Sequence, residues 1–120
     1  MSEKQPEASL AIQVLPQTAD GEELLRIVDT VIAYIKGTGL RTFVGPFETT
    51  IEGNFEKLCE IAREAQKICI REGAGSVSTY MKWVYAPKSG VWSIEKKDRQ
   101  ISKFLNNRVV RKLQFQNNFL

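Results

Sequence analysis

The sequence predicts an α+β domain in which two helices cover one face of a four-stranded antiparallel sheet. Three observations lead to this fold class. The chain contains four short stretches with the apolar or alternating pattern of strands, two longer stretches with helical periodicity, and Gly or Pro at most boundaries between them. Its 120 residues, 42% hydrophobic and 26% charged, have the size and composition of one globular domain.

The first predicted strand covers residues 10–15, a short apolar run that ends at Pro16. Side chains alternate between the two faces of a strand, and Gln13 falls in the set that points away from the core. The core-facing set is Leu10, Ile12 and Val14. The preceding residues 1–8 are polar and are expected to form a flexible N-terminus.

The first helix is expected to begin after Asp20, which can cap it, because Glu23 follows at the capping-box spacing. Gly37 and Gly39 indicate its end. Six apolar side chains fall on one stripe of this helix and are expected to face the core. They are Leu24, Leu25, Val28, Val31, Ile32 and Ile35.

Residues 41–44 and 48–52 are two further predicted strands. Gly45-Pro46 lies between them and indicates a tight turn, so the two strands should form an antiparallel hairpin. The second of these strands has an unusual chemistry, because one of its faces carries two carboxylates and a hydroxyl. That polar face consists of Glu48, Thr50 and Glu52, whereas Thr49 and Ile51 point the other way.

The second helix is expected to run from its N-cap, Asn54, to about Glu72, with Gly73 and Gly75 ending it. Residues 76–85 are rich in β-branched and aromatic side chains, as is typical of a strand. One face of this last strand is Val77, Thr79, Met81, Trp83 and Tyr85, and the other is Ser78, Tyr80, Lys82 and Val84.

The order strand, helix, strand, strand, helix, strand indicates the ferredoxin-like βαββαβ sandwich. In this topology the first strand lies between the third and the fourth, and both helices cover one face of the sheet. We expect this ferredoxin-like domain to span residues 9–98. Residues 99–120 would form a C-terminal extension, whose loosely helical apolar spacing favours a helix that docks on its own domain or on a neighbouring subunit. A disordered basic tail is the main alternative, and contact with nucleic acid or a membrane is a weaker one.

Composition excludes several classes of function. The chain contains no histidine, which removes the commonest general base and zinc ligand. Cys59 and Cys69 lie within one predicted helix, too far apart to pair, and are expected to be reduced in a cytoplasmic protein. The net charge of +3 does not by itself indicate nucleic acid. No apolar run approaches the ~20 residues of a membrane span, and secretion is not expected, because the polar residues 1–7 are not followed by an apolar segment.

A polar group is expected on the helix-free face of the sheet, around the central strand. It comprises Gln13, Glu48, Thr50, Tyr80 and Lys82. One interpretation is an ordinary solvated face with a Glu–Lys cross-strand pair worth about 0.2–1 kcal/mol. The apolar neighbours Ala11, Leu15 and Val84 instead favour a face that another subunit covers. Polar groups trapped under such a cover need partners, and a small polar ligand could supply them.

Several stretches of the chain together resemble one known family. They are Ile12–Pro16, Gly39-Leu40, Val44–Gly53, Gly73-Ala74, Val77, Lys82, Gly90-Val91 and Ser93–Lys97. They look like the small thiamine-binding proteins of the YkoF-like family, and the resemblance covers residues 9 to about 103. It implies a ferredoxin-like fold, assembly into dimers or tetramers through the sheets, and no catalysis. It also implies binding of thiamine or its hydroxymethylpyrimidine moiety, as a carrier or sensor in thiamine metabolism or salvage.

The expected ligand suits these residues. An aminopyrimidine offers ring acceptors and an amine donor, which the amide, carboxylate and hydroxyl groups of the polar set can bond. Tyr80 or Phe47 could provide an aromatic wall, and Glu52 could attract the cationic thiazolium. Lys82 would repel that cation and is expected either to neutralise Glu48 or to serve only the assembly of subunits. The expected ligand-binding set is Gln13, Phe47, Glu48, Thr49, Thr50, Glu52, Tyr80 and Lys82.

Three other functions are open on the residues alone. A structural or regulatory homo-oligomer would use the polar set as a hydrogen-bond network between subunits and bind no ligand. An RNA-recognition module shares the architecture, but the two glutamates near the central strands would repel phosphate. An enzyme acting on a pyrimidine precursor could use Glu48 and Glu52 for proton transfer, although no nucleophile or metal set has a recognisable spacing. The preferred form of the ligand, whole, pyrimidine or phosphorylated, stays open.

Overall fold

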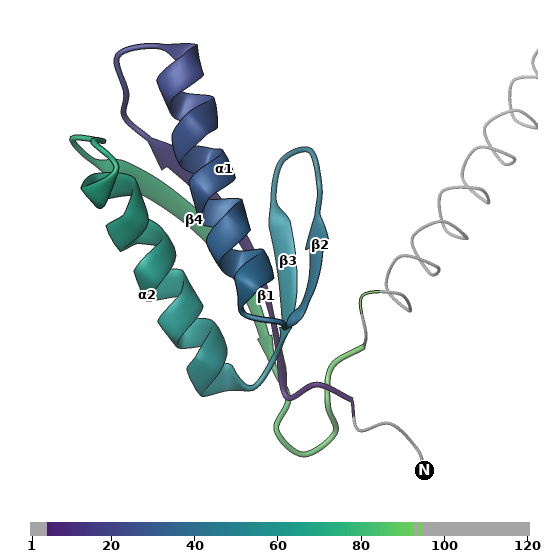
Figure 1. Cartoon of the computed structure of the whole chain (residues 1–120). Helices are drawn as coiled ribbons and strands as arrows, with labels where there is room; N and C mark the ends of the chain where they lie inside the picture. Colours follow the sequence, from purple (N-terminus) through teal and green to yellow (C-terminus); the bar gives the residue numbers. More distant parts are fainter. Residues whose placement is uncertain (1–4, 93, 95–120) are drawn as a thin grey trace, which may run out of the picture.

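The computed structural model of the chain describes residues 5–92 and residue 94. Its elements follow the predicted order and are labelled in Figure 1. They are β1 (Ala8–Pro16), α1 (Gly21–Gly37), β2 (Arg41–Val44), β3 (Thr49–Gly53), α2 (Phe55–Arg71) and β4 (Val77–Tyr85). The strand order in the sheet is β2-β3-β1-β4 and every pairing is antiparallel. The predicted ferredoxin-like fold is confirmed, whereas the predicted C-terminal extension lies outside the described residues.

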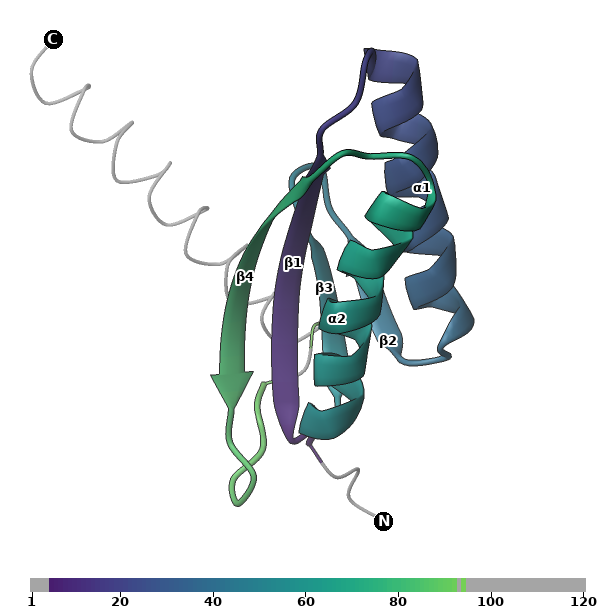
Figure 2. The same cartoon turned by 90° about the vertical axis from the view of Figure 1, so that its left-hand side faces the viewer.

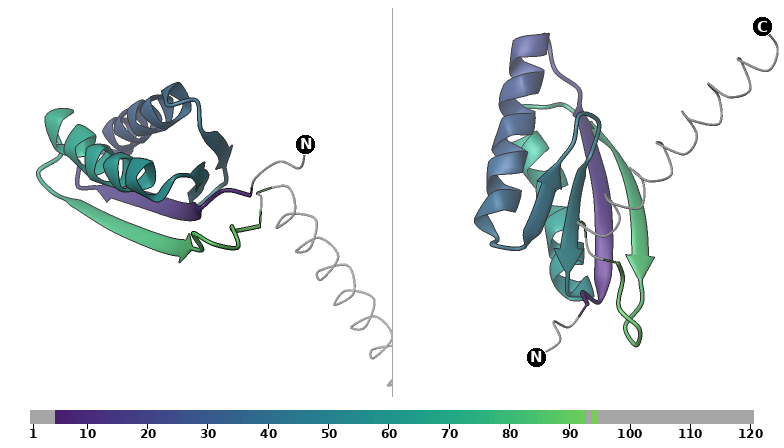
Figure 3. Two further views of the ribbon diagram at one scale, coloured as in Figure 1. Left: turned by 90° about the horizontal axis from the view of Figure 1, so that it is seen from below. Right: turned by 90° about the vertical axis from the view of Figure 1, so that its right-hand side faces the viewer.

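The domain has two layers. Both helices pack on the same face of the sheet, and the other face carries no helix within the described part of the chain, as Figures 2 and 3 show from three sides. The helix-covered face holds the core, since the fully buried side chains come from β1, β3 and the two helices. The helix-free face is therefore the surface on which a polar group can reach solvent or a partner.

β1 is longer than the apolar run that predicted it. It pairs with β4 over nine positions, from Ala8 opposite Tyr85 to Pro16 opposite Val77. The pairing continues past the strand, because the N–H of Ala86 donates to the carbonyl of Glu7 at 2.9 Å. Ala8 is fully buried, so the central strand begins before the apolar pattern does.

Both predicted helix caps are confirmed. The Asp20 side chain accepts a hydrogen bond from the N–H of Glu23, and the Asn54 side chain accepts one from the N–H of Lys57, each at 2.9 Å. A cap of this kind contributes about 1 kcal/mol. The carboxylate of Glu7 also accepts the N–H of Phe55 at 2.9 Å, which ties the start of α2 to the strand at the centre of the sheet.

The two helices differ in how well their patterns predicted the core. On α2 the apolar periodicity predicts an inward stripe of five residues, of which four are buried and Phe55 is partly buried. The four are Leu58, Ala62, Ala65 and Cys69. On α1 the buried line is shifted, because this helix packs on α2 and β1 together. Its members are Ile27, Val31 and Ile35. Leu25, predicted to face the core, is 64% exposed, so this part of the prediction is wrong.

The two cysteines are free thiols. Cys69 lies in the core, where burial raises the pKa of its thiol, and Cys59 is partly exposed.

At the start of α2, the ring of Phe55 stacks on Tyr85 with 4.5 Å between ring centroids and meets Trp83 edge-on at 5.4 Å. This cluster closes the end of the core between α2 and β4.

The shifted core of α1 can be tested with a matched pair of variants. Ile27→Ala should lower the free energy of unfolding by about 2–5 kcal/mol, because it leaves a cavity in a fully packed site. Leu25→Ala should change it by about 0.5 kcal/mol or less, because that side chain is mostly in water. Urea unfolding followed by circular dichroism measures both values. Equal losses in the two variants would contradict the packing of α1 described here.

Candidate functional site

The polar set on the helix-free face is brought together by the register of the strands. Gln13 pairs directly with Tyr80 of β4. Two residues earlier on β1, and on the same face, Ala11 pairs with Lys82 of β4 and with Thr50 of β3. Directly paired residues in a sheet share a face, so these side chains project together, with the small Ala11 leaving space between its neighbours.

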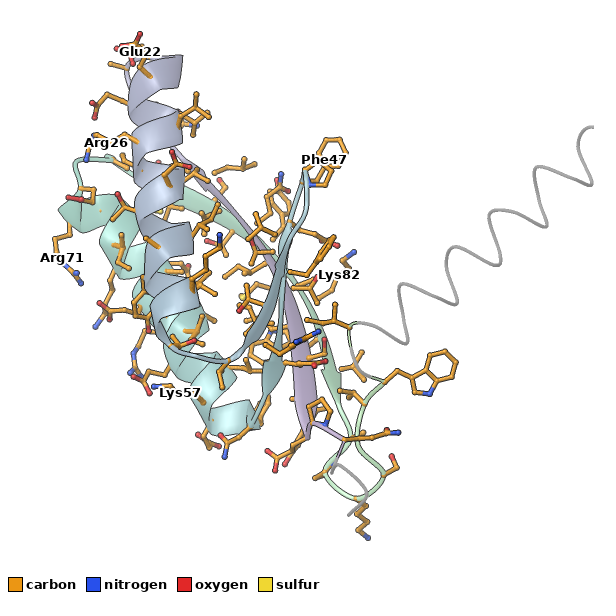
Figure 4. The ribbon with its side chains drawn as sticks, turned by 45° about the vertical axis from the view of Figure 1, so that its right-hand side comes forward. Glu22, Arg26, Phe47, Lys57, Arg71 and Lys82 are labelled. Carbon is orange, nitrogen blue, oxygen red and sulfur yellow. The ribbon has the colours of Figure 1, made fainter. Side chains whose placement is uncertain are left out.

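An ion pair crosses the central strand on this face. The Nζ atom of Lys82, on β4, lies 3.1 Å from Oε1 of Glu48, at the end of the β2–β3 turn. Since β1 lies between β3 and β4, this contact spans β1. Lys82 extends from the sheet in Figure 4 and its side chain is 75% exposed, so the pair contributes at most about 1 kcal/mol. Lys82 and Glu48 thus neutralise each other, as the sequence predicts.

Glu52 has a structural partner instead of a place in this set. It is buried, and its Oε2 atom accepts a hydrogen bond from the N–H of Ile94 at 2.9 Å. The chain after β4 therefore returns to the sheet. Val91 strengthens this return, since it is buried and its N–H donates to the carbonyl of Pro6 at 2.8 Å.

Thr49 and Phe47 also lie apart from the polar set. Thr49 is buried and pairs with Ile12, so it belongs to the helix-covered face. Phe47 is 78% exposed at the tip of the β2–β3 hairpin, where Figure 4 shows its ring at the top of the turn. Six of the eight predicted residues lie on the helix-free face, since Glu52 pairs with Ser9 of β1, and five of them form the polar set. These five are Gln13, Glu48, Thr50, Tyr80 and Lys82.

The sheet opens next to this set. Pairing between β1 and β3 ends at Ile12 opposite Thr49. The chain then turns through residues 45–48, closed by a 2.9 Å hydrogen bond from the N–H of Gly45 to the carbonyl of Glu48. A Cβ atom on Gly45 would lie 3.0 Å from that carbonyl, which favours glycine there. The hairpin tip consequently stands away from the far end of β1, as Figure 1 shows.

A cavity of about 190 Å³ lies between α1, the end of β1 and the β2–β3 hairpin. It is lined mainly by apolar side chains, with Gln13, Glu48 and Thr49 as polar members. The cavity wall from α1 consists of Leu24, Leu25, Val28, Val31, Ile32 and Ile35. These are the six residues of the stripe that the sequence assigned to the core. Only Val31 and Ile35 of this stripe are buried in the core. The other four apolar residues of the stripe line the cavity without being fully buried.

Sequence reasoning missed this cavity. The cavity exists because α1 turns Ile27 toward the core and leaves Leu25 exposed. Both positions depend on how α1 docks on the sheet, which the periodicity of one helix does not indicate. Four of the predicted ligand-binding residues nevertheless line it. They are Gln13, Phe47, Glu48 and Thr49. Gln13 and Glu48 therefore belong both to the cavity wall and to the polar set on the helix-free face.

The described residues contain neither a metal-ligand cluster nor a membrane-spanning helix. No group of three or more Cys, Asp or Glu side chains lies there in an arrangement that could hold a metal ion. No helix within residues 5–92 is long and apolar enough to cross a membrane.

The sequence matches a protein family described as thiamine-binding protein over residues 10–102, which includes every strand and both helices. The chain belongs to the thiamine-binding protein family. A curated relative, the UPF0045 protein CPE1503 of Clostridium perfringens, is 46% identical over 88 residues, which cover 73% of this chain and 90% of the relative.

Solved structures agree with this membership in the thiamine-binding protein family. A domain of unknown function, DUF77, from Bacillus cereus has a TM-score of 0.68 and 34% identity, covering 74% of this chain and 85% of that one. A Thermotoga maritima protein described as a candidate for thiamine biosynthesis or salvage has a TM-score of 0.67 and 28% identity. That match covers 82% of this chain and 99% of the other.

The ion pair across β1 can be tested by a double-mutant cycle. Glu48→Gln and Lys82→Met should show a coupling of about 0.2–1 kcal/mol in the free energy of unfolding, reduced at high salt because Lys82 is exposed. Urea unfolding at two salt concentrations measures it, with the exposed Lys57–Glu60 pair on α2 as a comparison. Complete additivity of the two substitutions at low salt would show that the charges do not interact.

Proposed function

We propose that this chain binds thiamine or its hydroxymethylpyrimidine moiety without converting it, as a cytoplasmic carrier or sensor in thiamine metabolism or salvage. The observation that carries the proposal is the largely apolar cavity with Gln13 and Glu48 in its wall, in a chain of the thiamine-binding protein family. Ligand sites typically combine apolar walls with a few polar groups that fix orientation.

The size of the cavity supports a ligand that enters by one ring. Pockets for drug-sized molecules usually measure about 300–1,000 Å³, and this one measures about 190 Å³. A pyrimidine ring would occupy it, and the thiazolium of whole thiamine would extend past Glu48 toward the helix-free face. There the ring of Tyr80 favours a cation, whereas Glu48 and Lys82 together carry no net charge.

Binding without catalysis is supported by the residues available. The sequence contains no histidine, and the polar groups at the cavity are an amide, a hydroxyl and one carboxylate that is paired with Lys82. Such groups bind and orient a ring, but they supply no activated nucleophile. The family itself is described as a binding protein.

We infer that a second copy of the chain covers the helix-free face and that the protein is a dimer or tetramer through its sheets. Four large hydrophobic side chains are exposed on this face, which is unusual for a monomer. They are Leu15, Phe43, Tyr80 and Val84. A self-complementary contact between two sheets would bury them beside the polar set.

Ligand binding can be measured by calorimetric titration with thiamine and with hydroxymethylpyrimidine. Saturable binding of at least one compound is expected, and Glu48→Ala and Thr50→Ala should each weaken it about tenfold or more if these groups contact the ligand. Asp29→Ala, which removes an exposed carboxylate on the outer side of α1, is the control and should bind normally.

Two results would count against the ligand or its location. Folded, oligomeric protein that gives only heat of dilution with both compounds would favour a purely structural or regulatory role. Unchanged affinity in both Glu48→Ala and Thr50→Ala would place the ligand away from the polar set.

Assembly can be tested by light scattering. Tyr80→Asp and Val84→Asp should lower the mass toward that of one chain, 13.6 kDa, because each places a carboxylate in the proposed contact. Ile70→Asp, at a similarly exposed apolar position on α2, should leave the mass unchanged. A wild-type protein that is already monomeric would refute the inferred contact.

A further inference from the structure

The backbone of β1 has an orientation that the hydrogen bonds define. Successive residues of a strand direct their N–H and C=O groups to opposite edges. The N–H of Gln17 donates to the carbonyl of Ser76 at 2.8 Å, and the carbonyl of Glu7 accepts the N–H of Ala86 at 2.9 Å. Odd-numbered residues of β1 therefore direct their backbone groups toward β4.

Even-numbered residues of β1 must then face β3. Ile12 does so and pairs with Thr49, the last pair before β3 ends. Val14 is the next residue with this orientation, and the hairpin has already turned away at that point. No residue of the described part of the chain is recorded as a partner for the N–H or the C=O of Val14 on this edge.

Val14 lies in the cavity wall and is only 8% exposed. A buried backbone donor and acceptor without partners are costly, and nearly all such groups in proteins are paired with protein, water or ligand. The edge of β1 at Val14 thus presents one donor and one acceptor, side by side, to a largely apolar cavity.

We propose that the N–H and C=O groups of Val14 bind the edge of an aminopyrimidine ring in this cavity. This rests on the proposed function, since it assigns the contacts of the ligand named there. An aminopyrimidine carries a ring nitrogen that accepts a hydrogen bond next to an amine that donates one. The ring nitrogen accepts the N–H of Val14, and the amine donates to the carbonyl of Val14, so the ring replaces the missing strand partner.

The surroundings of Val14 suit a flat ring. Val28 and Val31 of α1 supply an apolar wall on one side, and Gln13 and Glu48 lie at the wall nearest the helix-free face. The contact also sets a specificity. A 4-oxo pyrimidine carries a donor where the amino compound has an acceptor and an acceptor where it has a donor, so both hydrogen bonds to Val14 would be lost.

Amide hydrogen exchange of the full chain, measured by nuclear magnetic resonance, tests the proposal. In the free protein the Val14 amide should exchange at least about tenfold faster than those of Ile12 and Gln13, which have strand partners. Saturation with hydroxymethylpyrimidine should slow Val14 about tenfold or more and leave Gln13 unchanged.

Calorimetry supplies a second measurement that needs no variant. The 4-oxo analogue of hydroxymethylpyrimidine should bind at least about 100-fold more weakly than the amino compound, because it leaves both Val14 groups unpaired. Val28→Phe, which fills the cavity beside Val14, should abolish binding, whereas Ile70→Phe on the outer surface of α2 should not.

The possible results separate this inference from the proposed function. Binding of hydroxymethylpyrimidine with unchanged exchange at Val14, or equal affinity for the 4-oxo analogue, would overturn the Val14 contact and leave the binding function standing. Slow exchange of Val14 in the free protein would also overturn it. Absence of binding to thiamine and to hydroxymethylpyrimidine would overturn both proposals.

Discussion

The unequal pairing of β1 determines the rest of this structure. β1 pairs with β4 over nine residues but with β3 over only five, so the centre of the sheet is closed on one side and open on the other. The β4 side provides the rigid base, with Tyr80 and Lys82 held opposite Gln13 and Ala11. On the other side, the β2–β3 hairpin turns away from β1 beyond Thr49, and α1 lies across the resulting opening. The cavity and the polar set are two sides of this single opening.

Alternation and capping made the fold predictable. Asp20 and Asn54 cap the helices as their positions indicate, and the faces of β1 and α2 follow from local periodicity. These features depend on neighbours within a few residues along the chain. The ion pair between Lys82 and Glu48 was also predictable, because it follows once the strand order is known.

Other features of the site depend on contacts between distant parts of the chain. Glu52 shares a face with Glu48 in the strand pattern, yet its partner, the N–H of Ile94, comes 42 residues later. The shift from Leu25 to Ile27 on α1 arises because the helix meets α2 and β1 together, whereas periodicity describes only one helix at a time. The point where β3 leaves β1 depends on the turn at Gly45, which alternation does not detect.

The position of Gln13 has a thermodynamic consequence. Gln13 is a residue of the cavity wall, and its side chain lies on the face that a second copy would cover. Two binding events that share a residue are linked, and linkage is reciprocal. If occupancy of the cavity changes the free energy of association between subunits, association must change the affinity for the ligand by the same factor. A change in ligand concentration would then shift the assembly equilibrium, and a change in protein concentration would shift the binding equilibrium, through one residue.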